Sequence, residues 1–170
     1  MDFGNRGVRS VEQVDVMQRL WAEEHVTFQG QWHNIDDAGI NPLPINRRVP
    51  VWFGGHVDET LRRIAKYGDG WIMLAHPEGD EAERAFDQLR AYWAEEGRAG
   101  APGLSVWVSN AEGGPDDWRK SISYWKSVGV THITVNTTFG RYGHKRIEGR
   151  TLADHLQAMV QYHAAVADLL

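Results

Sequence analysis

The sequence contains no cysteine in its 170 residues, which excludes disulfide bonds and thiolate catalysis. No apolar run approaches the roughly 20 residues that a membrane-spanning helix needs. The opening residues MDFGNRGVRS lack the apolar core of a signal peptide, so we expect a soluble, cytoplasmic protein. Basic residues number 18 against 23 acidic ones, and the net charge of −5 disfavours nucleic acid as a partner. The length suits a single domain, 1–170, with its own core.

Several motifs that mark enzymes are also missing, since there is no GxGxxG, GxxxxGK[ST] or GxSxG. The eight histidines show no HExxH spacing. His25 and His33 flank one segment without a convincing third metal ligand. Three others could converge near strand ends: His76, His132 and His144. We expect no metal site, and a metal-dependent hydrolase stays only as an alternative that elemental analysis would test.

Short apolar runs alternate with amphipathic segments along most of the chain. The runs predict strands at Val49–Phe53, Trp71–Ala75, Leu104–Ser109 and His132–Asn136. Helices are predicted at about 10–23, 58–67, 80–96, 115–127 and from Thr151 to the C-terminus. This alternation predicts an α/β fold with a parallel sheet, and nearly all-apolar strands indicate burial on both faces. Segment 24–46 predicts a hairpin or loop excursion before the first of these strands.

Helix boundaries have their own signals. Ser10 and Gln13 form a candidate capping box for the first helix, and Thr151 with Asp154 could cap the last. Pro115 suits the first turn of its helix. Gly68 and Gly129 stand where a left-handed residue would end a helix. One stripe of the last helix collects Leu152, Leu156, Met159, Val160 and His163.

The first strand of the series ends in Gly54-Gly55-His56, and a helix follows at once. Glycine lets the backbone approach a ligand closely, and the next helix directs free N–H groups to the same place. These residues therefore suit a phosphate cradle, although a tight turn that binds nothing explains them equally well. Asp58 and Glu59 count against a cradle because their charges would repel an anion if they pointed inward.

Ligands of parallel α/β sheets bind at the carboxyl ends of the strands. His76 follows the second strand and Asn136 ends the fourth. A basic cluster comes next: Arg141, His144, Lys145 and Arg146. The loop after the last strand often binds phosphate in closed barrels, but a solvated loop between glycines is the alternative.

The segment RVPVWFGGHVDETLRRIAKYGDGWIML (48–74) resembles the central signature of the luciferase-like monooxygenase superfamily. Members have an apolar strand ending in Gly-Gly, then a helix, then Gly-Asp-Gly-Trp opening the next strand. The upstream stretch 5–46 is similar to the family segment before it, with Arg-Gly, Leu-Trp, Phe-x-Gly and Asn-Pro-x-Pro in order. SVGVTHITVN (127–136) resembles the last barrel strand, so the resemblance covers essentially the whole chain.

The resemblance implies a parallel (β/α) TIM barrel and a flavin- or deazaflavin-dependent oxidoreductase or monooxygenase. It implies that Gly54 and Gly55 lie where relatives hold the phosphate of FMN or of a deazaflavin coenzyme. His56 departs from the small polar residue expected there. The substrate, a small organic molecule, would face His76, Asn136 and Arg141. No catalytic residue is assigned.

A complete barrel has eight strands and about 250 residues, whereas this chain supplies about four strands, matching the second half of the family pattern. A half-barrel exposes two strand edges and an apolar inner face. We expect a homodimer to close the sheet, with a separate chain supplying the missing strands as the alternative. A non-catalytic half-barrel remnant or interaction subunit, which binds no cofactor alone, is the alternative function.

Overall fold

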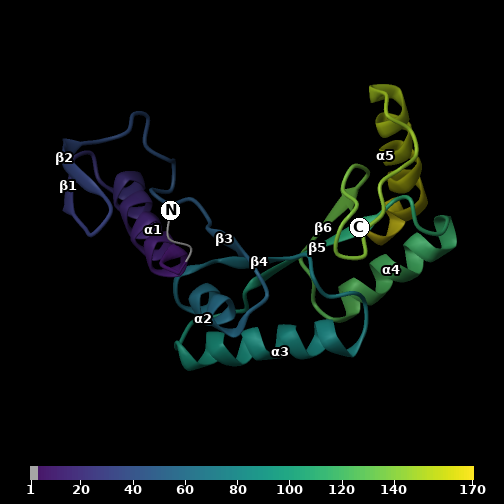
Figure 1. Cartoon of the computed structure of the whole chain (residues 1–170), viewed down its shortest axis with the longest axis horizontal. Coiled ribbons are helices and arrows are strands. Elements are labelled where there is room, and N and C mark those ends of the chain that lie inside the picture. The colour runs from purple at the N-terminus through teal and green to yellow at the C-terminus, as the bar shows by residue number, and fades with distance from the viewer. Residues whose placement is uncertain (1–3) are drawn as a thin grey trace.

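A four-stranded parallel sheet forms the centre of the computed structural model, which describes residues 4–170 (Figure 1). The strands pair in chain order and are β3 (Trp52–Gly54), β4 (Gly70–Met73), β5 (Gly103–Ser109) and β6 (His132–Asn136). The connections contain α2 (Asp58–Tyr67), α3 (Asp80–Glu95) and α4 (Pro115–Ser127). After β6 come α5 (Leu152–Val166) and the short 3-10 helix η1 (Ala167–Leu169). The predicted α/β fold of about four strand–helix units is confirmed.

The hydrophobic core lies between the sheet and the three connecting helices. Alternate strand residues point to opposite faces of a sheet, and Leu104 and Val106 of β5 are buried on the helix side. Trp71 and Met73 of β4 join them there. Residues of the three helices complete the core: Leu61, Ile64, Phe86, Leu89, Ile122 and Trp125. Burial of these large side chains is what holds the helices against the sheet.

The other face of the sheet carries no helix over β4 and β5 in the described residues (Figure 1). Trp52 partly covers it. A Cβ at Gly70 would lie 2.6 Å from the Trp52 ring, and a Cβ at Gly103 would lie 2.4 Å from it. The Trp52 ring also meets the His132 ring edge-on, with 4.8 Å between centroids. One indole therefore lies across the neighbouring strands at their amino ends, and glycine is needed beneath it.

The N-terminal segment forms α1 (Arg6–Ala22) and a hairpin of β1 (Val26–Gln29) and β2 (Asn34–Ala38). The predicted start at Ser10 is wrong, because Asn5 is the N-cap and the helix already includes Ser10. The Ser10 hydroxyl donates to the Gly7 carbonyl at 2.7 Å inside the first turns, so it does not cap the helix.

Two glycine predictions at helix ends have opposite outcomes. Gly129 has φ +86° after α4, which confirms its left-handed conformation. Gly68 has φ −96°, so the prediction of a left-handed cap there is wrong. Glycine at position 68 is instead explained by lack of room for a side chain, because a Cβ would lie 3.0 Å from the Phe53 ring and 3.1 Å from the Ile64 carbonyl. The chain passes from α2 into β4 in an extended conformation.

The last helix is capped as expected, but its apolar stripe does not face the core. The Thr151 hydroxyl accepts a hydrogen bond from the Asp154 N–H at 3.2 Å, and Asp154 reaches back to Thr151. The stripe residues Leu152, Leu156, Met159 and Val160 are exposed. α5 instead buries the face with Ala158, Tyr162 and Val166, because α4 packs on that side.

Candidate functional site

The turn between β3 and α2 presents backbone to solvent. Gly54, Gly55 and His56 are exposed, and Gly55 has φ +114°, a conformation that glycine adopts far more readily than other residues. The Gly55 carbonyl accepts a 2.6 Å hydrogen bond from the Nε1 of the buried Trp71, which fixes the turn. A Cβ at Gly55 would lie 3.1 Å from Thr60. The backbone conformation at position 55 therefore favours glycine strongly, and a side chain there would also crowd Thr60.

The amino end of α2 has no hydrogen-bonded side-chain cap among the described residues. Asp58 in the first turn accepts hydrogen bonds from the Tyr92 hydroxyl and, at 2.8 Å, from the Arg62 Nε. The hydrogen bond from Tyr92, and next that from Arg62, hold the pKa of Asp58 below its ordinary value. The Asp58 charge is thus engaged by Arg62, which weakens the sequence-based argument against an anion at this end of α2.

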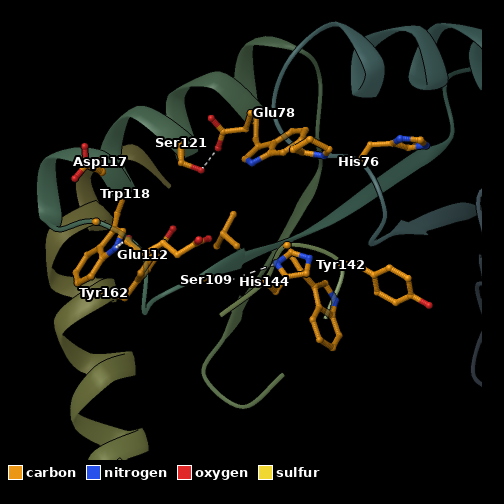
Figure 2. A pocket seen from close by; sticks show the side chains of 16 residues that line it. His76, Glu78, Ser109, Glu112, Asp117, Trp118, Ser121, Tyr142, His144 and Tyr162 are labelled. Carbon is orange, nitrogen blue, oxygen red and sulfur yellow. Dashed lines mark hydrogen bonds between the residues drawn. The ribbon is translucent and has the colours of Figure 1, made fainter. Parts of the chain in front are cut away.

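A pocket of about 490 Å³ lies at the carboxyl ends of β4 and β5 (Figure 2). It is bounded by the segments that follow β4, β5 and β6 and by helices α4 and α5. Its polar and aromatic lining includes His76, Glu78, Trp107, Ser109, Glu112, Asp117, Trp118, Ser121, Trp125, Tyr142, His144 and Tyr162. A pocket in this place is where parallel α/β proteins bind their ligands.

Hydrogen bonds hold two sides of the pocket. The Ser121 hydroxyl donates to the Glu78 carboxylate across the gap between α4 and the segment after β4 (Figure 2). The Ser109 hydroxyl accepts from the Lys145 N–H at 3.0 Å and lies 3.4 Å from His144 Nδ1. The β6–α5 segment is therefore attached to the end of β5.

Tyr162 is the most deeply buried polar group of the pocket, with 2% of the residue exposed. Its ring stacks on Trp118 with centroids 5.0 Å apart. Its hydroxyl has no hydrogen-bond partner in the part of the chain that the structure describes. Burial, and to a smaller extent the negative charge of Glu78, raises the pKa of Tyr162 to about 12. The phenol is therefore uncharged at physiological pH.

The predicted substrate-side residues occupy different places. His76 lines the pocket, whereas Arg141 is exposed and is not part of the lining. Asn136 is buried, and its amide bonds the chain that follows it: Oδ1 accepts from the Phe139 N–H at 2.8 Å, and Nδ2 donates to the carbonyls of Phe139 and Lys145. Asn136 thus shapes the segment that borders the pocket.

The structure brings only part of the basic cluster to the pocket. His144 lines it, while the Lys145 ammonium pairs with Glu112 at 3.2 Å and Arg146 is exposed. Gly54, Gly55 and His56 are not among the lining residues. The β3–α2 turn and the pocket are linked through Trp71, which bonds Gly55 and meets the His76 ring at 6.3 Å.

Sequence reasoning did not select Glu78, Ser121 or Tyr162 as site residues. Glu78 had a usable signal, because it follows His76 by two residues at the same strand end. Ser121 and Tyr162 lie on helices. Helical spacing shows which residues share a face, but it does not show which element or pocket that face contacts.

Within residues 4–170, no group of three or more His, Cys, Asp or Glu is placed to hold a metal ion. None of the helices described there is long and apolar enough to cross a membrane.

The fold is a parallel half-barrel of the α/β class with a pocket at its strand ends. The chain belongs to the luciferase-like monooxygenase family, whose model matches residues 1–168. The sequence resemblance is thereby confirmed.

Relatives in this family differ in their cofactors. The chain is 28% identical over 133 residues to an uncharacterized protein of Mycobacterium tuberculosis, covering 78% of this chain and 43% of that one. It is 35% identical over 88 residues to an F420-dependent glucose-6-phosphate dehydrogenase of Intrasporangium calvum, covering 52% of this chain and 25% of the relative. It is 23% identical over 108 residues to an FMNH(2)-dependent dimethylsulfone monooxygenase of Pseudomonas putida, covering 64% of this chain and 30% of the relative. The chain therefore spans less than half the length of these relatives.

Solved structures agree on the fold. An F420-dependent secondary alcohol dehydrogenase superposes with a TM-score of 0.65 at 15% identity, covering 79% of this chain and 57% of the other. An EDTA monooxygenase from Chelativorans sp. BNC1 superposes with a TM-score of 0.54 at 18% identity, covering 75% of this chain and 36% of the other.

Proposed function

We propose that this chain forms part of a flavin- or deazaflavin-dependent oxidoreductase, with the cofactor's phosphate held by the backbone of Gly54, Gly55 and His56. The observation that supports it best is the β3–α2 turn, where Gly55 has φ +114° and the amino end of α2 has no hydrogen-bonded side-chain cap from residues 4–170. Backbone N–H groups and the positive end of the helix dipole suit a phosphate. Family members that use F420 or FMNH(2) support this class of cofactor.

The pocket would be the substrate side of the same site. When bound, FMN or a deazaflavin supplies the hydride or oxygen chemistry, and the protein binds, orients and excludes water. His76 lies in the pocket wall, and Asn136 and Arg141 belong to the β6 end and the segment that borders it. We assign no general acid or base.

Titration with FMN and F420, each beside its analogue without phosphate, tests the cradle. Gly55→Asp places a charge and a crowded Cβ in the turn, so binding of the phosphate forms should weaken roughly tenfold or more, about 1.4 kcal/mol. The analogues should lose much less. Gly97→Asp is the matched control, since Gly97 has φ +66° in an open turn whose next residue, Arg98, contacts the carboxyl end of α2, whereas Gly55 precedes its amino end. Equal losses for the phosphate forms and their analogues would contradict a phosphate cradle.

A non-catalytic half-barrel is the second candidate. It is favoured by the chain spanning 43% and 25% of two relatives, because the missing part of the fold could carry the rest of a cofactor site. The bound chromophore's absorbance separates the two proposals. Failure of the unmodified chain to bind either FMN or F420 would support this second proposal and contradict the first.

A further inference from the structure

The amino end of α2 has several hydrogen-bond donors that the described chain does not use. The N–H groups of His56, Val57, Asp58 and Glu59 make no hydrogen bond within residues 4–170. The first N–H groups of a helix lack acceptors inside the helix, and no side chain of the described residues caps them here. Every helix has such an end, so these donors alone do not identify a ligand.

Thr60, in the first turn of α2, has a side chain that points to a ligand independently. Only 7% of the residue is exposed. Its backbone N–H donates to the Val57 carbonyl at 2.9 Å, but its hydroxyl has no hydrogen-bond partner in the part of the chain that the structure describes. A polar group that is largely buried without a partner costs free energy, so this hydroxyl indicates a partner from outside the protein.

The Thr60 hydroxyl is directed at the glycine turn. Side chains of a helix point toward its amino end, and a Cβ at Gly55 would lie 3.1 Å from the Thr60 Oγ1. This oxygen keeps some exposed surface, because it has no partner and yet is not one of the described side-chain atoms that are both fully buried and unpartnered. A ligand that lies on the turn can therefore reach it.

The surroundings of the hydroxyl favour an anionic ligand. A hydroxyl can donate or accept, but the neighbouring N–H groups can only donate, so the group as a whole needs an acceptor. The positive end of the α2 dipole favours negative charge at the same place. The charge of Asp58 is engaged by Arg62, and that of Glu59 is exposed to solvent, which screens it.

We propose that the Thr60 hydroxyl donates a hydrogen bond to the phosphate at the β3–α2 turn, and so helps this chain to distinguish ligands with a phosphate from the same ligands without one. The inference rests on the proposed function for the identity of the phosphate-bearing ligand. Hydrogen bonds to a charged acceptor are roughly twice as strong as those between neutral groups, so the loss of this one should be measurable.

Inorganic phosphate tests the anion site in the full chain without cofactor. Two-dimensional ¹H–¹⁵N spectra follow the amide signals of residues 56–60 during the titration. We expect these signals to shift until they saturate, and the Kd to rise about five- to tenfold in Thr60→Val, which keeps the shape of the side chain and removes its hydroxyl. The absence of such shifts in the unmodified chain, or an equal Kd in Thr60→Val, would overturn the proposal.

Cofactors and their analogues separate a contact of the hydroxyl from a packing effect. Thr60→Val should weaken binding of FMN or F420 by a similar factor and leave the analogues without phosphate unchanged, while Thr60→Ser should restore most of the affinity. Thr134→Val is the control, since it makes the same change at an exposed position of β6, at the opposite edge of the sheet from β3. Equal losses with and without phosphate, or a loss in Thr60→Ser as large as in Thr60→Val, would contradict the hydroxyl contact.

This inference and the proposed function can fail separately. Phosphate binding that depends on Thr60, in a chain that binds neither FMN nor F420, would support the hydroxyl contact and contradict the proposed function. Cofactor binding that requires the phosphate but is unchanged in Thr60→Val would support the proposed function and overturn the role of Thr60.

Discussion

Tyr92 and Tyr162 have buried rings, but their hydroxyl groups are treated differently by the fold. The Tyr92 hydroxyl donates to Asp58 and accepts from the Arg62 Nη2 at 2.8 Å. The Tyr162 hydroxyl has no partner within the described chain. A buried hydroxyl stabilises the folded state only when its hydrogen bonds are made, so the two groups should contribute to stability with opposite signs.

We predict that Tyr162→Phe keeps or raises the midpoint of thermal unfolding. Tyr92→Phe should lower that midpoint by a few degrees, because Asp58 and Arg62 each lose a hydrogen bond. Calorimetry of the two variants beside the unmodified chain measures this. A marked loss of stability in Tyr162→Phe would mean that the Tyr162 hydroxyl is hydrogen-bonded in the folded protein, which would contradict this prediction.

Some site residues were accessible to sequence reasoning and others were not. His76 follows a strand and was selected for that reason, and it does line the pocket. Tyr162 belongs to a helix 86 positions away, and only the packing of α5 on α4 places it near His76. Asn136 stands at a strand end like His76, yet its amide is taken up by the chain that follows. Position along a strand predicts nearness to a site but not how a side chain uses its hydrogen bonds.

Among the elements, the hairpin of β1 and β2 is held to α1 by one carboxylate. Glu12 accepts hydrogen bonds from the N–H groups of Gln31, Trp32 and His33 at 2.7 to 2.8 Å and from the His33 ring at 2.8 Å. Desolvation acts to raise the pKa of Glu12, but these hydrogen bonds outweigh it and lower the pKa from 4.5 to about 2.

This predicts how stability depends on pH. The pKa of Glu12 is about 2 in the folded state and about 4.5 in the unfolded state, so its contribution is complete above pH 4.5 and disappears as the pH falls toward 2. Glu12→Gln should therefore be less stable than the unmodified chain at pH 6, and the difference should shrink between pH 4.5 and pH 2. Denaturant unfolding at several pH values checks this, with the exposed Glu24→Gln as control. A difference that does not change with pH would contradict the assigned role.

Element boundaries followed the sequence where local signals were strong. α2 and α4 have the predicted bounds, 58–67 and 115–127, and Pro115 occupies the first turn. α1 begins at Arg6 rather than Ser10, because a serine can also bond a carbonyl inside a helix. The sequence correctly placed the apolar stripe residues of α5 on one face of the helix. Periodicity alone does not show which of its two apolar faces packs against α4.

At the scale of the whole molecule, the sheet ends at β3 on one side and β6 on the other, with no further strand beside either in the described residues. The helix that follows β6, α5, has four exposed apolar residues: Leu152, Leu156, Met159 and Val160. Open strand edges and an apolar helix face invite association. We propose that two copies of this chain associate and cover these surfaces.

Light scattering tests this proposal. We expect a mass of twice the 19.3 kDa of one chain. Val160→Glu, at a residue with 67% of its surface exposed, should shift the protein toward the monomer with little loss of folding stability. Gln157→Glu adds the same charge at an exposed polar position of α5 and should leave association unchanged. A strictly monomeric, soluble unmodified chain would contradict the proposal.

The sequence by itself determined the α/β class, the order of strands and helices, the family, and the glycine turn after β3. These follow from local rules, because periodicity, caps and turn residues act over a few neighbouring positions. Only the tertiary structure decided that Asp58 bonds Arg62, that Trp52 lies over Gly70 and Gly103, and that the Tyr162 hydroxyl is buried without a hydrogen-bond partner among residues 4–170. The physical reason is that burial and pairing depend on contacts between segments that lie far apart in the sequence. Sequence separation does not predict which of these contacts form.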